Sequence, residues 1–188
     1  RTTLEAVGLS VPSLKEFRIF DLQPEKSRAL AAEFSDRWNI QVANSVQEAV
    51  DGADVIATMT TTRKPFIKTD WLKKGCFFAA MGKNEVEEQA LLEADLLVVD
   101  EWEQFKHYQP SILAQLYQAG RLQERDVVNL REIILKRISG RTEPDDRIHF
   151  LSFGLACEDL VVAERVYQTA KSMGLGQSLA LWDQPHWI

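Results

Sequence analysis

The sequence lacks the motifs that mark metal-dependent and nucleophilic enzymes. It contains no His-Glu-x-x-His, Cys-x-x-Cys, Gly-x-Ser-x-Gly or Walker loop, and its three histidines have no metal-ligand spacing. It also has no apolar run near the roughly 18 residues of a membrane span, no secretory h-region and no lipidation motif. We therefore expect no metal site, no nucleophilic mechanism and no membrane association.

Clusters of basic residues are also missing. Lys and Arg number 22 against 28 Asp and Glu, and Arg63-Lys64 and Lys73-Lys74 are only pairs. Nucleic-acid binding depends largely on clustered Lys and Arg, so no nucleic-acid partner is expected. Cys76 and Cys157 lie among apolar residues, as free thiols do, which favours a reducing, cytoplasmic location.

What the sequence does contain is a regular alternation of short apolar runs and helical patterns over its 188 residues. Short apolar strands separated by helices predict a parallel sheet buried on both faces, and thus a Rossmann-like, doubly wound α/β fold in one domain. The predicted strands are Phe17–Phe20, Ile40–Ala43, Val55–Met59, Cys76–Met81, Leu96–Val99 and Ile148–Phe153.

Helix start signals fall between these strands. Pro24 precedes one predicted helix, Ser45 and Glu48 form a capping box for the next, and Asn84 can cap a third. The polar loop Ser139–Asp146 is the one predicted internal boundary. The predicted helices are Thr2–Val7, Glu25–Trp38, Glu85–Glu93, Pro110–Ala119, Asp126–Arg137 and Leu155–Ser172, with a short one after Ser45.

An acidic residue follows the first predicted strand directly. In dinucleotide-binding βαβ units such an acid binds the adenosine ribose about 20 residues beyond a glycine-rich loop. Asp21 has this position, which would also favour NAD over NADP by repelling a 2′-phosphate. The sequence holds no such glycine loop, and the same spacing would put one at or before Arg1. The alternative is that Asp21 only forms a turn before Pro24.

Other groups at the predicted strand ends also have two interpretations. The threonines at 58 and 60–62 follow one strand and Gly82 follows the next, where ligands bind to parallel sheets, but they also suit an ordinary strand end and a tight turn. Asn84 is a good helix start with or without a ligand. Glu158 and Asp159, after Gly154, are typical of a first helical turn.

Four segments in this order resemble the ornithine cyclodeaminase/μ-crystallin family, from Arg1 to about Leu181. They are GADVIATMTTT at 52–62, WLKKGCFFAAMGKN at 71–84, EADLLVVDEWEQFKH at 93–107 and SFGLACEDLVVAERVY at 152–167. The resemblance implies an NAD(P)-binding Rossmann domain joined, in a dimer, to a domain for substrate binding and dimerisation.

The resemblance also implies site residues. Asp21 matches the ribose-binding acid, and Thr60 matches a threonine beside the cofactor. The loop that faces the nicotinamide is matched by Met81, Gly82, Lys83 and Asn84. Ser152 matches a further cofactor contact, and Phe153 matches a neighbour of the substrate.

One departure from the family directs the expected chemistry. In ornithine cyclodeaminases the matching segment resembles Gly-Gly-Asp, whereas this chain has Gly82-Lys83-Asn84. The side chain of Asn cannot exchange a proton near neutral pH. The first hypothesis is therefore an NAD-dependent oxidoreductase that interconverts an imine, or a 2-oxo acid plus amine, with an amino acid. The alternatives are ornithine cyclodeaminase, which Asn84→Asp would distinguish, and a noncatalytic NAD-binding or ligand-binding crystallin-like protein.

The resemblance places the glycine loop, the first strand and the substrate and dimerisation domain upstream of Arg1. Residues 1–188 are thus expected to be a partial NAD-binding domain, inert alone and active, as a homodimer, in a longer polypeptide. If the first strand of the Rossmann fold is missing from this chain, the sheet should have a gap between the strands at 17–20 and 55–59, where that strand usually lies.

Overall fold

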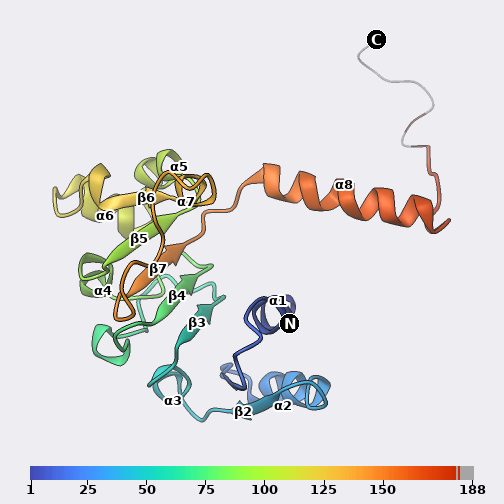
Figure 1. Cartoon of the computed structure of the whole chain (residues 1–188), viewed down its shortest axis with the longest axis horizontal. Helices are drawn as coiled ribbons and strands as arrows, with labels where there is room; N and C mark the ends of the chain where they lie inside the picture. Colours follow the sequence, from blue (N-terminus) through green and yellow to red (C-terminus); the bar gives the residue numbers. More distant parts are fainter. Residues whose placement is uncertain (181, 183–188) are drawn as a thin grey trace. The chain divides into compact units, whose positions relative to one another are not determined.

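Parallel strands build two sheets in a computed structural model of the chain, which describes residues 1–180 and 182 (Figure 1). Leu181 and His186 lie outside the described residues. A two-stranded sheet pairs β1 with β2, and a five-stranded sheet has the order β3-β4-β7-β5-β6, with every pair parallel. The α/β prediction is confirmed. The strands are β1 (Glu16–Ile19), β2 (Asn39–Val42), β3 (Val55–Thr58), β4 (Phe77–Ala80), β5 (Leu96–Val99), β6 (Val127–Asn129) and β7 (Ile148–Leu151).

The last strand lies inside the five-stranded sheet and not at its edge. β7 pairs with β4 on one side and with β5 on the other. Sequence order alone could not predict this insertion. It matters for function because it brings the end of β7 next to the end of β4, where the N–H of Ser152 donates to the carbonyl of Ala80.

The sheet is interrupted at the predicted place. Among the described residues β1 pairs only with β2, and β3 pairs only with β4, so β1 and β3 belong to different sheets. Each therefore has one edge of unpaired backbone groups, which in native sheets is normally paired or covered. Ala57 in the middle of β3 is exposed, whereas Ile56 and Thr58 on its other face are buried.

Several helices are shorter than predicted. The helix predicted over 25–38 ends at Glu33, and that predicted over 85–93 begins only at Glu88, with Glu87 as its N-cap. Asn84 therefore does not cap it. The α-helices are α1 (Thr2–Ser10), α2 (Pro24–Glu33), α3 (Val46–Val50), α4 (Glu88–Leu92), α5 (Trp102–His107), α6 (Ile112–Gln118), α7 (Leu130–Ile134) and α8 (Ala156–Ser172), with 3₁₀ turns η1 (Thr69–Trp71) and η2 (Glu124–Asp126).

Two local predictions have different outcomes. The Ser45 cap is confirmed, because its hydroxyl accepts from the N–H of Glu48. The single helix predicted over 126–137 is wrong, because Val127 and Val128 pair with β5 before α7 begins. Their β-branched side chains favour a strand, and this local preference decides over the longer helical pattern.

The main core lies on one face of the five-stranded sheet. Phe78 and Leu97, both buried, point to the face that also carries Leu151, and buried residues of α4, α5 and α6 complete the cluster. The opposite face holds an apolar hollow of about 360 Å³ under α7. It is lined by Phe77, Leu96, Val98, Leu130, Ile133, Gly140, Ile148 and Phe150.

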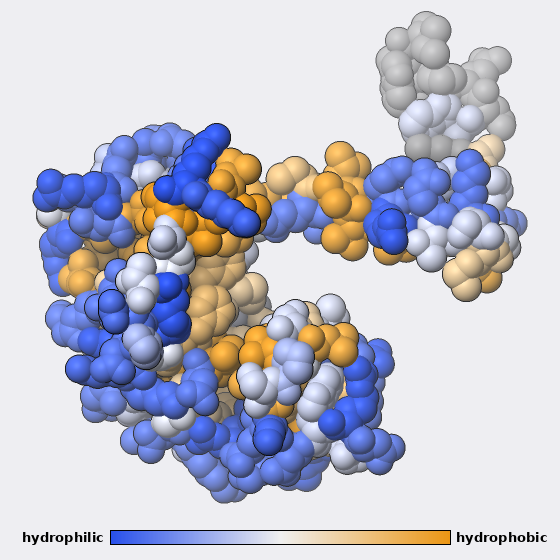
Figure 2. All heavy atoms as spheres, in the orientation of Figure 1, coloured by the Kyte–Doolittle hydropathy of each residue, from blue (hydrophilic) through white to orange (hydrophobic). Residues whose placement is uncertain are grey.

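The chain divides into two compact units, 1–153 and 154–188. The division follows Phe153, so the boundary predicted in the loop 139–146 is wrong. That loop is held together by Asp146, whose carboxylate accepts from Thr142 and Glu143; these bonds lower the pKa of Asp146. In the second unit α8 exposes a set of apolar side chains, orange in Figure 2, that includes Leu160, Val161, Val162 and Val166.

Candidate functional site

A buried carboxylate joins the ends of β3 and β4. Glu85, only 1% exposed, accepts hydrogen bonds from the hydroxyl of Thr58 (2.6 Å), the hydroxyl and N–H of Thr60 (2.6 Å each) and the N–H of Gly82 (2.9 Å). We call Glu85, Thr58, Thr60 and Gly82 the Glu85 cluster. Two of the predicted site residues, Thr60 and Gly82, are thus brought together by a residue that the sequence reasoning did not select.

The Glu85 cluster has no cationic partner among the described residues. A buried carboxylate is costly unless its oxygens are hydrogen-bonded, and here each oxygen accepts two bonds. The close packing also explains Gly82: a Cβ there would lie 2.6 Å from Cδ of Glu85 and 2.9 Å from the carbonyl oxygen of Thr60. Glycine is therefore required at this point of the loop.

A second carboxylate joins the ends of β5 and β7. Asp100, which follows β5, accepts from the hydroxyl of Ser152 (3.1 Å) and the N–H of Phe153 (2.8 Å). It too is buried. The predicted site residues at 152 and 153 therefore have fixed positions, and Asp100 is a second residue that the sequence reasoning missed.

The Lys83 ammonium lies against aromatic rings. Its nitrogen is 4.6 Å from the ring centre of Phe153 and 5.3 Å from that of Tyr108, within the range of cation–π attraction. Phe153 is itself packed edge-on between Phe105 and Tyr108. Lys83 is half-buried, and among the described residues no carboxylate pairs with it. A cation is thus held where the loop after β4 meets the end of β7.

The side chain of Asn84 is bonded at both ends. Its NH₂ group donates to the carbonyl of Pro110 (2.8 Å), and its oxygen accepts from the N–H of Ile112 (2.8 Å). Asn84 therefore holds the loop after β4 to the start of α6, next to the cap formed by Ser111. Met81 beside it is 38% exposed.

Asp21 lies just beyond β1 and is exposed. One carboxylate oxygen accepts from the N–H of Gln23 (2.8 Å), which is the turn-forming contact of the alternative interpretation. Among the described residues nothing donates a hydrogen bond to the second oxygen, so it can accept one from a ligand, and the residue lies at the carboxyl end of its strand. The turn and the ribose role are compatible.

Sequence signals for the two missed carboxylates were present but ambiguous. Glu85 stands close to Glu87 and Glu88 and begins the helix predicted over 85–93, a position where acids are common, although the helix begins three residues later. Asp100 directly follows the apolar run Leu96–Val99, just as Asp21 directly follows the predicted strand Phe17–Phe20. Only the strand order shows which donors each carboxylate meets.

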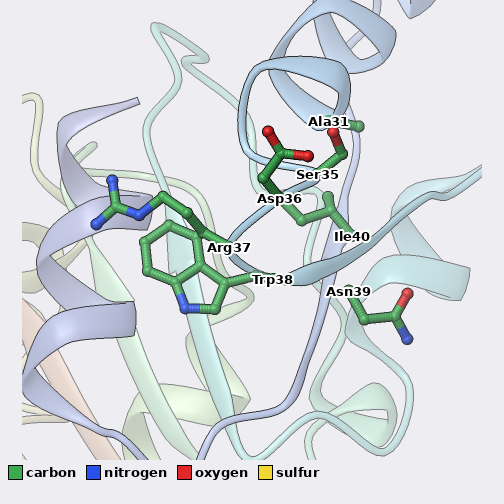
Figure 3. A pocket seen from close by; sticks show the side chains of 7 residues that line it. All are labelled: Ala31, Ser35, Asp36, Arg37, Trp38, Asn39 and Ile40. Carbon is green, nitrogen blue, oxygen red and sulfur yellow. The ribbon is translucent and has the colours of Figure 1, made fainter.

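Two further features lie apart from these strand ends. A hollow of about 470 Å³ is lined by residues between α2 and the amino end of β2, including Arg37 and Trp38 (Figure 3). Arg37 pairs there with Glu5 of α1. His149 on β7 is 1% exposed, its two nitrogens find no hydrogen-bond partner in the described part of the chain, and burial lowers its pKa to about 4.

Some types of site find no support in the described part of the chain. No group of three or more His, Cys, Asp or Glu side chains is arranged to hold a metal ion there. Of the helices in residues 1–180 and 182, none has the length and apolar character that a bilayer crossing requires.

A parallel sheet whose strand ends gather hydroxyls, the loop that contains Gly82 and two carboxylates defines an α/β protein with the Rossmann-like fold of dinucleotide-binding enzymes. The particular family follows from a comparison with known families. The chain belongs to the ornithine cyclodeaminase/mu-crystallin family, whose model matches residues 1–174. This confirms the resemblance noted in the sequence.

Individual relatives are enzymes. The chain is 31% identical over 159 residues to N-((2S)-2-amino-2-carboxyethyl)-L-glutamate dehydrogenase of Staphylococcus aureus, covering 80% of this chain and 47% of the relative. Among solved structures, Δ1-pyrroline-2-carboxylate reductase of Thermococcus litoralis, in complex with NADH and L-proline, has a TM-score of 0.83 at 26% identity, over 95% of this chain and 57% of that one.

A third relative is an archaeal alanine dehydrogenase dimer with bound NAD. It has a TM-score of 0.81 at 28% identity, covering 96% of this chain and 57% of that one. The chain spans about half the length of the curated relatives it matches.

Proposed function

We propose that this chain is the cofactor-binding part of an NAD-dependent oxidoreductase that acts on C–N bonds, reducing an imine, or a 2-oxo acid plus amine, to an amino acid. The observation that carries the proposal is that the predicted site residues Thr60, Gly82 and Ser152 all lie at the carboxyl ends of the neighbouring strands β3, β4 and β7, the first two bonded to Glu85 and the third to Asp100. The named activities of the relatives support the same reaction class.

The residues at this edge fit a nicotinamide ring. The hydroxyl oxygen of exposed Thr60 can still accept a hydrogen bond, and Gly82 lets the loop after β4 pack closely against Glu85 and Thr60. Thr60, Ser152 and residues 81–84 would hold the nicotinamide end, and Asp21 the adenosine ribose. When bound, NADH supplies the reducing equivalents, and the protein fixes geometry.

The chain's own groups would then orient the substrate. The Lys83 ammonium, held over Phe153 and Tyr108, provides positive charge for a substrate carboxylate or a cofactor oxygen at the same edge. Phe153 provides an apolar wall. Asn84, whose amide is bonded to Pro110 and Ile112, serves to hold the loop and not to transfer protons. This disfavours the cyclodeaminase alternative.

The interrupted sheet supports the remaining part of the proposal. A strand between β1 and β3 would pair both unpaired edges, and we place the glycine loop, that strand and a substrate and dimerisation domain in a longer polypeptide. We further propose that this polypeptide is a homodimer and prefers NAD to NADP because of Asp21. Its free thiols Cys76 and Cys157 favour the cytoplasm.

The test compares residues 1–188 with the longer polypeptide. Quenching of tryptophan fluorescence by NADH measures binding, and consumption of NADH is then followed across a panel of 2-oxo acids with amines and of cyclic imines. We expect turnover by the longer polypeptide and none by residues 1–188 alone. Binding without turnover throughout the panel would favour the noncatalytic carrier, and equal turnover by both would refute the account of the gap.

A further inference from the structure

The Glu85 cluster uses up the hydrogen-bond donors at the ends of β3 and β4. Two of the four groups that contact Glu85 are the backbone N–H groups of Thr60 and Gly82, which can only donate. Each carboxylate oxygen receives one of them and must therefore act as an acceptor. The hydroxyls of Thr58 and Thr60 must then also donate to Glu85, at 2.6 Å each.

Thr60 is left with one kind of interaction to offer. A hydroxyl has a single proton, so once this proton points to Glu85 the oxygen can only accept from a ligand. Its other contact, with the N–H of Thr62 at 3.4 Å, is longer than an ordinary N–H···O bond. Thr60 is exposed whereas Thr58 is buried, so Thr60 is the member of the cluster that a ligand can reach.

We propose that Glu85 is a positioning residue that makes Thr60 an obligatory acceptor for the carboxamide NH₂ group of the nicotinamide ring. This inference rests on the proposed function and adds a specificity to it: the protein distinguishes the amide dinucleotide from the dinucleotide with nicotinic acid in its place. The acid form would bring a carboxylate to an acceptor oxygen, with the Glu85 carboxylate directly behind it.

The chain offers a matched control for Glu85. Glu87, two residues later, also accepts from the N–H and hydroxyl of one threonine, Thr69, at 3.0 and 3.3 Å, but its side chain makes no cap hydrogen bond to α4 and has no hydrogen bond with Thr60 or Gly82. Glu85→Gln and Glu87→Gln are therefore the same chemical change with and without the proposed role. Thr60→Val and Thr61→Val form a second such pair, because Thr61 is also exposed and makes no hydrogen bond with Glu85 among the described residues.

The experiment measures dissociation constants of NADH and of reduced nicotinic acid adenine dinucleotide for the longer polypeptide by tryptophan fluorescence. In the unaltered protein NADH should bind at least about tenfold more tightly than the acid form. Glu85→Gln removes one acceptor and lets a threonine hydroxyl turn toward the ligand, so the ratio should fall to within about threefold of one. Glu87→Gln should keep the original ratio.

Thr60→Val provides an independent test of the same contact if the Glu85→Gln variant does not fold. It should weaken NADH about tenfold and leave the acid form unchanged, whereas Thr61→Val should change neither. Equal binding of both dinucleotides by the unaltered protein, or an unchanged ratio in Thr60→Val, would overturn the role of Glu85 while leaving the proposed oxidoreductase intact. Failure of either dinucleotide to bind would overturn both proposals.

Discussion

The β3–β4 end and the β5–β7 end of the sheet are built alike but offer different chemistry. Each is closed by a buried carboxylate, Glu85 in the first and Asp100 in the second. At the first end the carboxylate takes the donors of Thr60 and Gly82, which leaves an accepting surface. At the second end Asp100 fixes Phe153, over which the Lys83 ammonium lies.

This difference would orient a ligand in the proposed site. An accepting surface suits the donor groups of a carboxamide, and an ammonium against aromatic rings suits an anionic group of a substrate or cofactor. A neutral ring and a carboxylate-bearing substrate would therefore be placed by opposite ends of the same edge. Four substitutions test this comparison, from the largest expected effect to the smallest.

Removal of the Glu85 carboxylate from the β3–β4 end should have the largest effect on stability. Glu85→Ala leaves the buried hydroxyl of Thr58 and the N–H of Gly82 without partners, and it should lower the free energy of unfolding by about 3 kcal/mol or more. Glu87→Ala, which frees only the half-buried groups of Thr69, should cost less than about 1 kcal/mol. Urea unfolding of both variants measures the difference, and equal losses would contradict the importance of the Glu85 cluster.

β7, the strand between β4 and β5, carries a buried base, His149, whose ring nitrogens have no hydrogen-bond partner within residues 1–180 and 182. Burial, with a smaller effect of Arg147, lowers the pKa of His149 to about 4, below the unfolded value of about 6.5. The unfolded chain therefore takes up the proton first as the pH falls, so stability is retained above pH 6.5 and lost between about 6.5 and 4. Between pH 7 and 4.5 this loss is about 2.5 kcal/mol.

His149→Leu should remove that loss, and exposed His107→Gln should not. Urea unfolding at the two pH values gives the comparison for each variant. If His149→Leu loses as much stability in acid as the unaltered protein, His149 is not the group that titrates.

Asn84→Asp alters how the loop after β4 is held to the start of α6. The aspartate can still accept from the N–H of Ile112 but cannot donate to the carbonyl of Pro110, so we expect a loss of about 1.5 kcal/mol. Because the side chain is bonded to the start of α6, we expect no cyclodeaminase activity in the longer polypeptide. Formation of proline and ammonia from ornithine by this variant would instead support the acid/base interpretation of position 84.

Asp21 lies at neither end and should affect only the choice of dinucleotide. Asp21→Ser removes the charge that would repel a 2′-phosphate and should lower the preference for NADH over NADPH about tenfold. The turn contact with Gln23 can be kept by the serine hydroxyl, so stability should change little. Steady-state kinetics with both cofactors measure the ratio, and an unchanged ratio would leave Asp21 with the turn alone.

Much of the fold was predictable because buried parallel strands have a simple pattern. Leu96–Val99 was predicted to the residue, and the other strands named from the sequence differ by one or two residues at their ends. The place of β7 between β4 and β5 was not predictable, because pairing depends on contacts between distant segments. Short elements such as β6 were missed for a related reason, since three residues carry too little periodicity.

The residue types of the site were predictable, but the hydrogen bonds that join them were not. Thr60, Gly82 and Ser152 were named from the resemblance, whereas the carboxylates that bind them were not. Glu85 is 27 residues from Thr58, and Asp100 is 52 from Ser152, so no local pattern reveals either pair. For Asn84 a local pattern was misleading. The sequence predicted that Asn84 caps the helix at 85–93, whereas its side chain is bonded to the start of α6.

The central claim is that this edge of the sheet serves reduction of a C–N double bond by NADH. The most direct test incubates the longer polypeptide with cyclic imines, or with 2-oxo acids and amines, and NADH carrying deuterium at nicotinamide C4, in separate reactions for each face of the ring. The account predicts an amino acid with deuterium on its α-carbon from one of the two labelled cofactors. Binding of NADH with no labelled amino acid from any substrate of the panel would contradict it.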